Sequence, residues 1–223
     1  MPYCPIAKEK VVYLDCLECE HKQNDCKKLE EVWIGVDQSY TDTGIAVVRS
    51  GKVVYIGDVN FKGCADRHEK RLQLASKLEG IILKLKTKYA VSVNIEAVRL
   101  FSGSQPHIST QYIFATCALV GTIVDLCKKN SVPVYWVETR SWKKAILGRS
   151  KPTGRKLAGV KDKNKVDAIL YCIALGLKDK ISYVVKRGKN KGQIRYNDNR
   201  ADAVCIALCG ALHKDKIKNI EDF

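Results

Sequence analysis

The sequence has no apolar run that approaches the roughly 20 residues of a membrane-spanning helix. Its first residues, Met1-Pro2-Tyr3-Cys4, also lack the hydrophobic stretch that is typical of a signal peptide. We therefore expect a cytoplasmic protein with no membrane partner. Because an export signal is missing, the ten cysteines favour free thiols or metal ligation over disulfides.

Acidic residues are also scarce, with 24 Asp and Glu against 39 Lys and Arg, which gives a net charge of +15. The excess is concentrated between Arg140 and Arg195, where 17 Lys and Arg face three Asp. Such a field attracts polyanions through counterion release, and nucleic acid is the usual partner. Solubility, a membrane surface or an acidic protein are alternative explanations of the same charge.

The first thirty residues carry a group of cysteines at Cys4, Cys16, Cys19 and Cys26. Cys16 and Cys19 have the spacing of a tight turn that grips one tetrahedral Zn²⁺, and Cys4 and Cys26 can complete the coordination. So short a polar segment could hardly bury a core alone, so it would gain its order from the metal. We predict a structural zinc knuckle, with His21 as a substitute ligand and four free thiols as the alternative.

The segment from Val32 to Val48 is an apolar strand, a polar turn and a second apolar strand. Asp37 ends the first of these strands. A carboxylate at the end of a buried strand loses its hydration, so it needs hydrogen-bond donors or a metal ion. The alternative is a turn in which Asp37 caps its own backbone amides.

A second strand, from Tyr89 to Ile95, also ends in an acid, Glu96. If the two strands are neighbours, Asp37 and Glu96 face each other across roughly 5 Å, where two anions repel unless a cation lies between them. A salt bridge from Glu96 to Arg99 is the alternative.

Residues 197–213 form a predicted helix that begins with polar residues and continues almost wholly with apolar ones. Asp198 or Asn199 could cap it. Asp202 lies one turn inside, on a face that should be buried, so it needs a partner. Asp198 and Asn199 precede it by four and three residues, which places them on the same face, where they can join it around one ion.

The remaining pattern alternates strands and helices. Strands are predicted over 44–48, 52–59 and 133–137, and helices over 67–88, 108–126, 139–147 and 163–175. Glycine- and lysine-rich stretches at 148–163 and 185–191 are predicted as loops over the basic face, and order there could require a partner. A chain of 223 residues accommodates one main domain, so we expect a zinc knuckle over 1–30, a domain over 31–216 and a polar tail over 217–223.

These residues resemble the RuvC-type Holliday-junction resolvases of the RNase H-like superfamily, in the form carried by phages. The resemblance runs from about Trp33 to His213 and rests on three motifs, Gly35-Val36-Asp37 with Thr43-Gly44, Asn94-Ile95-Glu96, and Asn199-Arg200-Ala201-Asp202-Ala203. It implies an α/β fold with a mixed five-stranded sheet flanked by helices, and catalytic, metal-binding roles for Asp37, Glu96 and Asp202. Candidate residues that meet DNA are Arg140, Lys143, Lys144, Lys163 and Lys165, with Phe101 in the loop after Glu96.

The implied chemistry is phosphodiester hydrolysis with two Mg²⁺ or Mn²⁺ ions, one activating water and one stabilising the leaving oxygen. Asp37 would bridge both ions, Glu96 would hold one, and Asp202 with Asp198 or Asn199 would hold the other. The resemblance further implies a homodimer that nicks a four-way junction symmetrically, in association with nucleoid or phage DNA. The chain departs from the family pattern at Asn199, where the family usually has an acid, and in its N-terminal cysteines.

Three alternatives remain. Gly35 to Gly44 also resembles the phosphate loop of sugar kinases and actin, but those proteins need two such domains. A DNA-binding protein that kept the fold without catalysis is a second alternative, because Asn199 weakens the acid set. An RNase H-like nuclease acting on hybrids or flaps is a third, because carboxylates do not encode the shape of the substrate.

Overall fold

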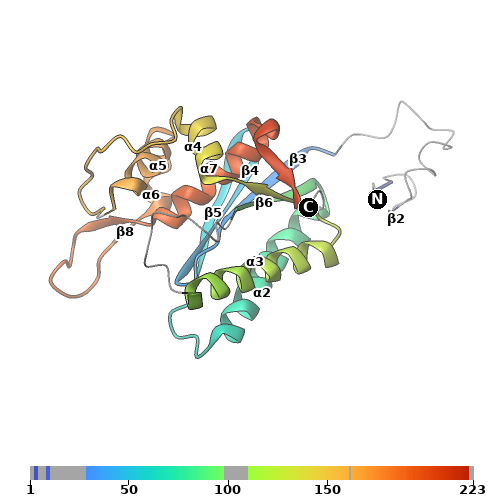
Figure 1. Ribbon diagram of the computed structural model, residues 1–223, viewed down its shortest axis with the longest axis horizontal. Helices are drawn as coiled ribbons and strands as arrows, with labels where there is room; N and C mark the ends of the chain where they lie inside the picture. Colours follow the sequence, from blue (N-terminus) through green and yellow to red (C-terminus); the bar gives the residue numbers. More distant parts are fainter. Residues whose placement is uncertain (1–2, 5–8, 11–28, 98–109, 161, 221–223) are drawn as a thin grey trace.

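A mixed sheet of six strands forms the centre of the computed structural model, in the order β10-β7-β6-β3-β4-β5 (Figure 1). The structure describes residues 3–4, 9–10, 29–97, 110–160 and 162–220. The strands are β3 (Glu31–Asp37), β4 (Asp42–Arg49), β5 (Lys52–Asn60), β6 (Ala90–Glu96), β7 (Val134–Val137) and β10 (Ile217–Asn219). β3, β4 and β5 pair antiparallel, β3, β6 and β7 pair parallel, and β10 adds antiparallel to β7.

The sixth strand corrects the prediction of five. β10 lies in the stretch 217–223 that we predicted as a polar tail, and it pairs Ile217 with Val137. The main domain therefore extends beyond residue 216. Ile217, Lys218 and Asn219 are too few to show an alternating pattern, so the sequence offered no signal for this strand.

Helices cover both faces of the sheet (Figure 1). α2 (Arg67–Lys86) and α3 (Thr110–Lys129) lie on one face. α4 (Thr139–Leu147), α5 (Lys163–Ala174) and α7 (Asp198–Leu212) lie on the other. The short α6 (Lys178–Ile181) leads into a two-stranded hairpin of β8 (Ser182–Val184) and β9 (Ile194–Tyr196), and η1 (Lys214–Lys216) precedes β10.

The two faces of β3 belong to different halves of the core. Val32, Ile34 and Val36 are fully buried in the cluster that includes α2 and α3. Because side chains alternate along a strand, Gly35 and Asp37 point to the opposite face, where α7 packs. A Cβ at Gly35 would overlap the backbone of Ala203 and Ala207 of α7, so this glycine sets the close approach of helix and strand.

The segment Gln111–Lys129 of α3 is, by length and composition alone, apolar enough to cross a membrane, with a mean hydropathy of 1.2. In the fold 44% of it is buried, and Leu119 and Ile123 pack in the core against the sheet. Core helices of folded domains meet the same criterion, so this feature is weak evidence for a membrane span.

The described residues of both stretches predicted as loops contain no helix or strand before α5 begins at Lys163, which confirms the prediction. The Asp167 carboxylate accepts hydrogen bonds from the backbone N–H of Thr153, at 2.9 Å, and from its hydroxyl, and so ties the stretch before α5 to that helix. The stretch predicted as a loop over 185–191 is the tip of the β8–β9 hairpin.

The structure does not test the predicted zinc site. Cys16, Cys19 and Cys26 lie outside the described residues, and Cys4 is described only as part of the short strand β1 (Tyr3–Cys4), which pairs with β2 (Glu9–Lys10). Phe101 and Arg99 also lie outside the described residues. The zinc knuckle and the role of Phe101 stay predictions.

Candidate functional site

Two carboxylates end adjacent parallel strands. β3 and β6 pair in register, with Val36 opposite Ile95, so that Asp37 and Glu96 follow at neighbouring positions on the same edge of the sheet. This confirms the predicted pairing of the two strands. Both side chains point to the α7 face, because Gly35 and Asn94, two residues earlier on each strand, contact α7.

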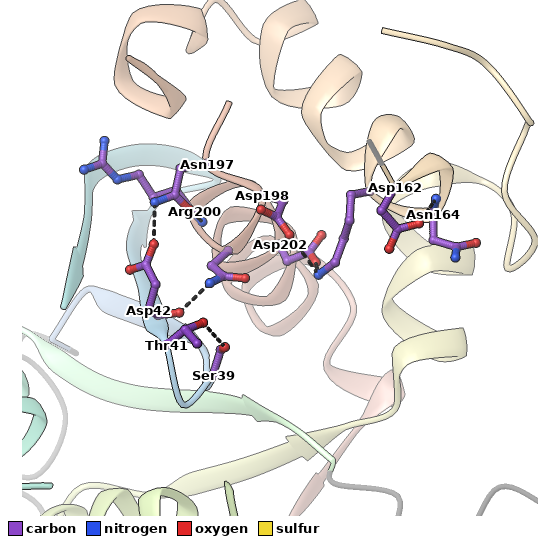
Figure 2. A network of polar contacts seen from close by, with 11 residues as sticks. Ser39, Thr41, Asp42, Asp162, Asn164, Asn197, Asp198, Arg200 and Asp202 are labelled. Carbon is purple, nitrogen blue, oxygen red and sulfur yellow. Dashed lines mark hydrogen bonds and ion pairs between the residues drawn. The ribbon is translucent and has the colours of Figure 1, made fainter. Parts of the chain in front are cut away.

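Helix α7 brings two further carboxylates to this edge. Asp198 is its first residue and Asp202 follows one turn later, so both lie on one face (Figure 2). The helix is held tightly on the sheet, since the Asn94 amide donates to the Ile206 carbonyl at 3.0 Å.

The N-cap of α7 is Asn197, whose side chain accepts a hydrogen bond from the Arg200 N–H at 2.9 Å. The prediction that Asp198 or Asn199 caps the helix is therefore wrong. Because Asn197 satisfies the helix end, the carboxylate of Asp198 is left to interact elsewhere.

Lys165, on α5, links the two acids of α7. Its Nζ lies 2.6 Å from Asp202 Oδ2 and 3.5 Å from Asp198 Oδ2. We predicted that this residue meets DNA, but its side chain is only 29% exposed and its ammonium is directed at the acids. Burial acts to lower the pKa of Lys165, but Asp202 and Asp37 outweigh burial and raise it. Lys165 therefore carries its charge at any physiological pH.

The buried acids are short of positive charge in spite of Lys165. Burial raises the pKa of Asp37 well above its usual range, Asp202 and Glu96 raise it further, and Lys165 opposes them. Burial likewise raises the pKa of Asp202, while Lys165 opposes that shift. The three carboxylates of Asp37, Glu96 and Asp202 thus lie close enough to repel one another.

Two buried carboxylate oxygens of this group, Asp37 Oδ2 and Asp202 Oδ1, have no hydrogen-bond partner among the residues that the structure describes. Asp37 is 6% exposed and Asp202 is 5% exposed, so bulk water does not compensate them. Leaving such atoms unsatisfied is costly, and a hard divalent cation is the partner that oxygen atoms of this kind accept best. In the part of the chain that the structure describes, no three His, Cys, Asp or Glu side chains are already arranged around one ion position. The acids fit a metal by the chemistry of their oxygen atoms and not by an arrangement already formed around an ion, and Lys165 provides positive charge beside them.

Glu96 is oriented by two residues that the sequence analysis did not single out. The Trp142 Nε1 of α4 donates to Glu96 Oε1 at 2.9 Å, and the Gln38 side chain donates to the Glu96 carbonyl at 2.5 Å. Trp142 is 1% exposed. Its indole N–H is a single donor that needs a partner when buried, which is the signal that could have connected the two.

Asn199, unlike Asp198, is directed away from the acids. Its amide nitrogen donates to the backbone carbonyl of Asp42 at the start of β4. A Cβ at Gly44 would overlap the Asn199 backbone, so helix and strand meet closely here. Asn199 therefore fastens α7 to β4.

A second group of polar side chains, which the sequence analysis missed, supports the start of α7 (Figure 2). Asn197 donates to Asp42 Oδ2 at 2.9 Å, and Arg200 Nε donates to Asp58 Oδ1 of β5 at 3.0 Å. Burial and the neighbouring Asp58 raise the pKa of Asp42 to about 6, whereas Asn197 and Arg200 act to lower it. This group positions the helix that carries Asp198 and Asp202.

The other predicted DNA-binding residues with described positions lie on α4 and α5, the helices that also carry Trp142 and Lys165. Arg140, Lys144 and Lys163 are exposed. Lys143 lies 5.3 Å from the centre of the Trp142 ring and is close enough to Asp202 to influence its pKa. Lys143 and Lys165 therefore bring positive charge close to the acids.

Comparison of the sequence with models of protein families gives no match, and comparison with curated proteins gives none either. Solved structures do match. RuvC of Thermus thermophilus in complex with a Holliday junction substrate has a TM-score of 0.57 at 16% identity, over 85% of this chain and 99% of that chain. Another structure of Thermus thermophilus RuvC has a TM-score of 0.54 at 17% identity over the same shares of both chains. The chain thus has the RuvC-like, RNase H-like fold, which confirms the predicted fold class.

Proposed function

We propose that this chain is a metal-dependent endonuclease that nicks four-way or branched DNA. The observation that carries the proposal is the group of four carboxylates at one edge of the sheet, with buried oxygens on Asp37 and Asp202 that lack a partner in the described part of the chain. α4 and α5 bring Lys143 and Lys165 close to the acids and carry further exposed basic residues. Buried acids in need of cations beside a surface suited to phosphates are what phosphodiester hydrolysis requires.

The residues that would hold Mg²⁺ or Mn²⁺ are Asp37, Glu96, Asp198 and Asp202. We assign Asp198 in preference to Asn199, because Asp198 shares Lys165 with Asp202 whereas the Asn199 amide nitrogen is bonded to Asp42. Two such ions, when bound, lower the pKa of an attacking water and stabilise the leaving oxygen.

The protein's own side chains prepare this chemistry. Trp142 fixes the orientation of Glu96 through its indole N–H. Lys165 favours the ionised form of the acids before the ions bind, because its ammonium opposes the rise in the pKa values of Asp37 and Asp202. Arg140, Lys144 and Lys163 are exposed on α4 and α5, the helices that carry Trp142 and Lys165, and we assign their charges to contacts with DNA phosphates.

Branched DNA is the substrate that the structural similarity favours, since one of the similar structures is RuvC with a Holliday junction substrate. A four-way junction has two-fold symmetry, and a homodimer would place one acid group at each of two strands. We therefore propose a homodimer associated with DNA in the cytoplasm. Sedimentation of the full chain, alone and with a junction, tests the dimer.

One observation favours a second candidate, a DNA-binding protein without catalysis. Lys165 already pairs with two of the acids, as a permanent counter-ion would. The two candidates differ in metal binding. Calorimetric titration with Mn²⁺ should show binding to the nuclease and none to a protein in which Lys165 has replaced the ions.

The nuclease proposal is tested by Asp37→Asn with a synthetic four-way junction and Mg²⁺. We expect nicking to fall by more than about 100-fold while junction binding is unchanged, because even outer-shell changes at metal sites cost about 10–100-fold. Asp125→Asn is the matched control, since Asp125 is exposed on α3, on the other face of the sheet. Nicking of forked, flap and RNA–DNA hybrid substrates is measured in parallel, and the substrate that is nicked fastest identifies the preferred structure. Undiminished nicking by Asp37→Asn would refute the assignment.

A further inference from the structure

The β8–β9 hairpin is a strongly basic element that the proposed active site does not use. It spans residues 182–196 and projects from the α5–α6 end of the molecule (Figure 1). Its tip carries Lys186, Arg187, Lys189 and Lys191, all exposed, and the stretch 182–196 contains no acid. Positive charge is therefore concentrated at the end of a protruding element.

The hairpin has a defined backbone along its whole length. Beyond the paired strands, the Val185 N–H donates to the Gln193 carbonyl at 3.0 Å and the Gly192 N–H donates to the Val185 carbonyl at 2.9 Å. The tip turns through the Lys191 N–H, which donates to the Gly188 carbonyl at 3.0 Å. Gly188 and Gly192 have positive φ values of 82° and 84°, which side chains with a Cβ rarely adopt. The backbone hydrogen bonds and the two glycines thus give the tip that carries the four basic residues a defined conformation.

Both faces of this ribbon are exposed. Val184 pairs with Ile194 on one face, and they are 55% and 46% exposed. Tyr183 pairs with Arg195 on the other face and is 51% exposed. A two-stranded ribbon alone is only marginally stable in water, so exposed apolar side chains on both faces indicate a surface that a partner covers.

The charge determines which kind of partner fits. Lys186, Arg187, Lys189, Lys191 and Arg195 are five cations without a compensating acid in the hairpin, which suits a polyanion. The major groove of duplex DNA is about 12 Å wide and admits a two-stranded ribbon, with phosphates along both sides of the groove. Duplex DNA therefore matches both the shape and the charge of the hairpin.

The base of the hairpin is attached to the helix that carries the acids. Ile181, just before β8, is fully buried, and its carbonyl accepts the Asn197 N–H at 2.7 Å. Asn197 is also the N-cap of α7, and Arg200 donates to the Lys180 carbonyl at 3.0 Å. The base of the hairpin is thus fixed to the helix that carries Asp198 and Asp202.

We propose that the β8–β9 hairpin is a DNA-binding ribbon that grips a duplex arm beside the cut site, an inference that rests on the proposed nuclease function. The tip lysines and Arg187 contact backbone phosphates, and Tyr183, Val184 and Ile194 lie against the groove. The ribbon positions the arm relative to α7 and contributes binding without taking part in hydrolysis.

The test removes the four tip charges together in Lys186→Gln, Arg187→Gln, Lys189→Gln and Lys191→Gln. The matched control removes four exposed lysines in and next to α2, in Lys62→Gln, Lys77→Gln, Lys84→Gln and Lys88→Gln. Both sets are placed in the Asp37→Asn background, and junction binding is measured by fluorescence anisotropy at several salt concentrations. We expect the hairpin variant to bind at least about 10-fold more weakly, with the salt slope reduced by about 2 to 4, since each lost phosphate contact reduces the slope by about 1.

Equal affinity and equal salt slope in the hairpin and control variants would overturn the proposal. A changed sedimentation coefficient with an unchanged salt slope would assign the hairpin to a protein contact and would also overturn it. Nicking is measured separately with Asp37 intact and enzyme in excess over DNA. The hairpin variant should then nick at the wild-type rate once DNA is saturated, so loss of binding and absence of nuclease activity are read independently.

Discussion

Asp37, Asp202 and Lys165 form a group whose charges do not balance. The two buried acids repel each other, and Lys165 compensates them from one side only. An unsatisfied buried polar atom costs about 1–3 kcal/mol, so the free protein is less stable than its packing would allow. At the proposed metal site, binding of a divalent cation would relieve that cost, which would couple metal affinity to stability.

Removing Lys165 should make this coupling measurable. We expect Lys165→Met to lower the free energy of unfolding by about 2 kcal/mol without metal, because breaking a buried ion pair leaves the acids uncompensated. Mg²⁺ should then raise the melting temperature of the variant more than that of the wild type, because the ion no longer competes with an ammonium. Lys163→Met, an exposed change on the same helix, should leave both quantities unaltered. Calorimetric melting with and without Mg²⁺ is the measurement. An equal rise in melting temperature on adding Mg²⁺ to the wild type and to Lys165→Met would contradict the expectation.

Asp42 should make stability depend on pH. Its pKa is raised from 3.8 to about 6 by burial and by Asp58, so its protonated form is favoured in the folded state. The stability from that form is present below about pH 4 and is lost as the pH rises through about 6. Between pH 4 and pH 7, Asp42→Asn should therefore gain about 1–2 kcal/mol relative to the wild type, after allowance for solvent screening. Urea unfolding across this range measures the gain, and a constant difference between the two proteins would exclude it. Asp125→Asn should show that constant difference.

At the scale of elements, the site depends on how closely α7 lies on β3 and β4. Gly35→Ala places a methyl group against the backbone of Ala203 and Ala207, so helix and strand must separate. We expect a loss of about 2 kcal/mol or more in unfolding free energy, as overpacking of a core usually gives, together with loss of nicking. In Gly80→Ala, on the exposed side of α2, the new methyl group meets nothing within 4 Å and should stabilise by about 0.5–1 kcal/mol. Chemical denaturation of both variants is the measurement, and equal stability of the two would show that the close approach is unimportant.

The elements that the sequence predicted well are those with a long pattern. Strands ending at Asp37 and Glu96, and the helix that carries Asp202, show their periodicity over many residues. The β10 strand and the paired strands of the hairpin have three residues each, which is too few for a pattern. They form because neighbours pair with them, and a single sequence does not reveal such pairing.

The site was predictable only in part for a related reason. Acids at strand ends stand out in a sequence, because burial makes them need a partner. The contacts of Lys165 with Asp202 and of Trp142 with Glu96 join residues 37 and 46 positions apart, and they depend on the angles at which helices pack. Charge alone therefore suggested that Lys165 meets DNA, whereas the fold directs it to the acids.

At the scale of the whole molecule, the net charge of +15 should dominate DNA affinity. If six or more phosphates are contacted, junction binding should weaken by about 1,000-fold between 50 and 200 mM salt. Asp37→Asn should show the same salt dependence, because the acids take no part in the long-range attraction. Fluorescence anisotropy in the absence of divalent ions measures this dependence. A weak salt dependence would mean that the basic surface has another purpose.

The position of the four acids along the chain has a consequence for synthesis. Asp37 lies on β3 and Asp202 on α7, 165 positions later, and closing so long a loop is a slow step of folding. A nascent chain on the ribosome therefore exposes the lysines and arginines of residues 182–196 before its last helix docks. In the proposed nuclease, such a chain is attracted to DNA before its acids meet, so cutting requires that translation has passed α7.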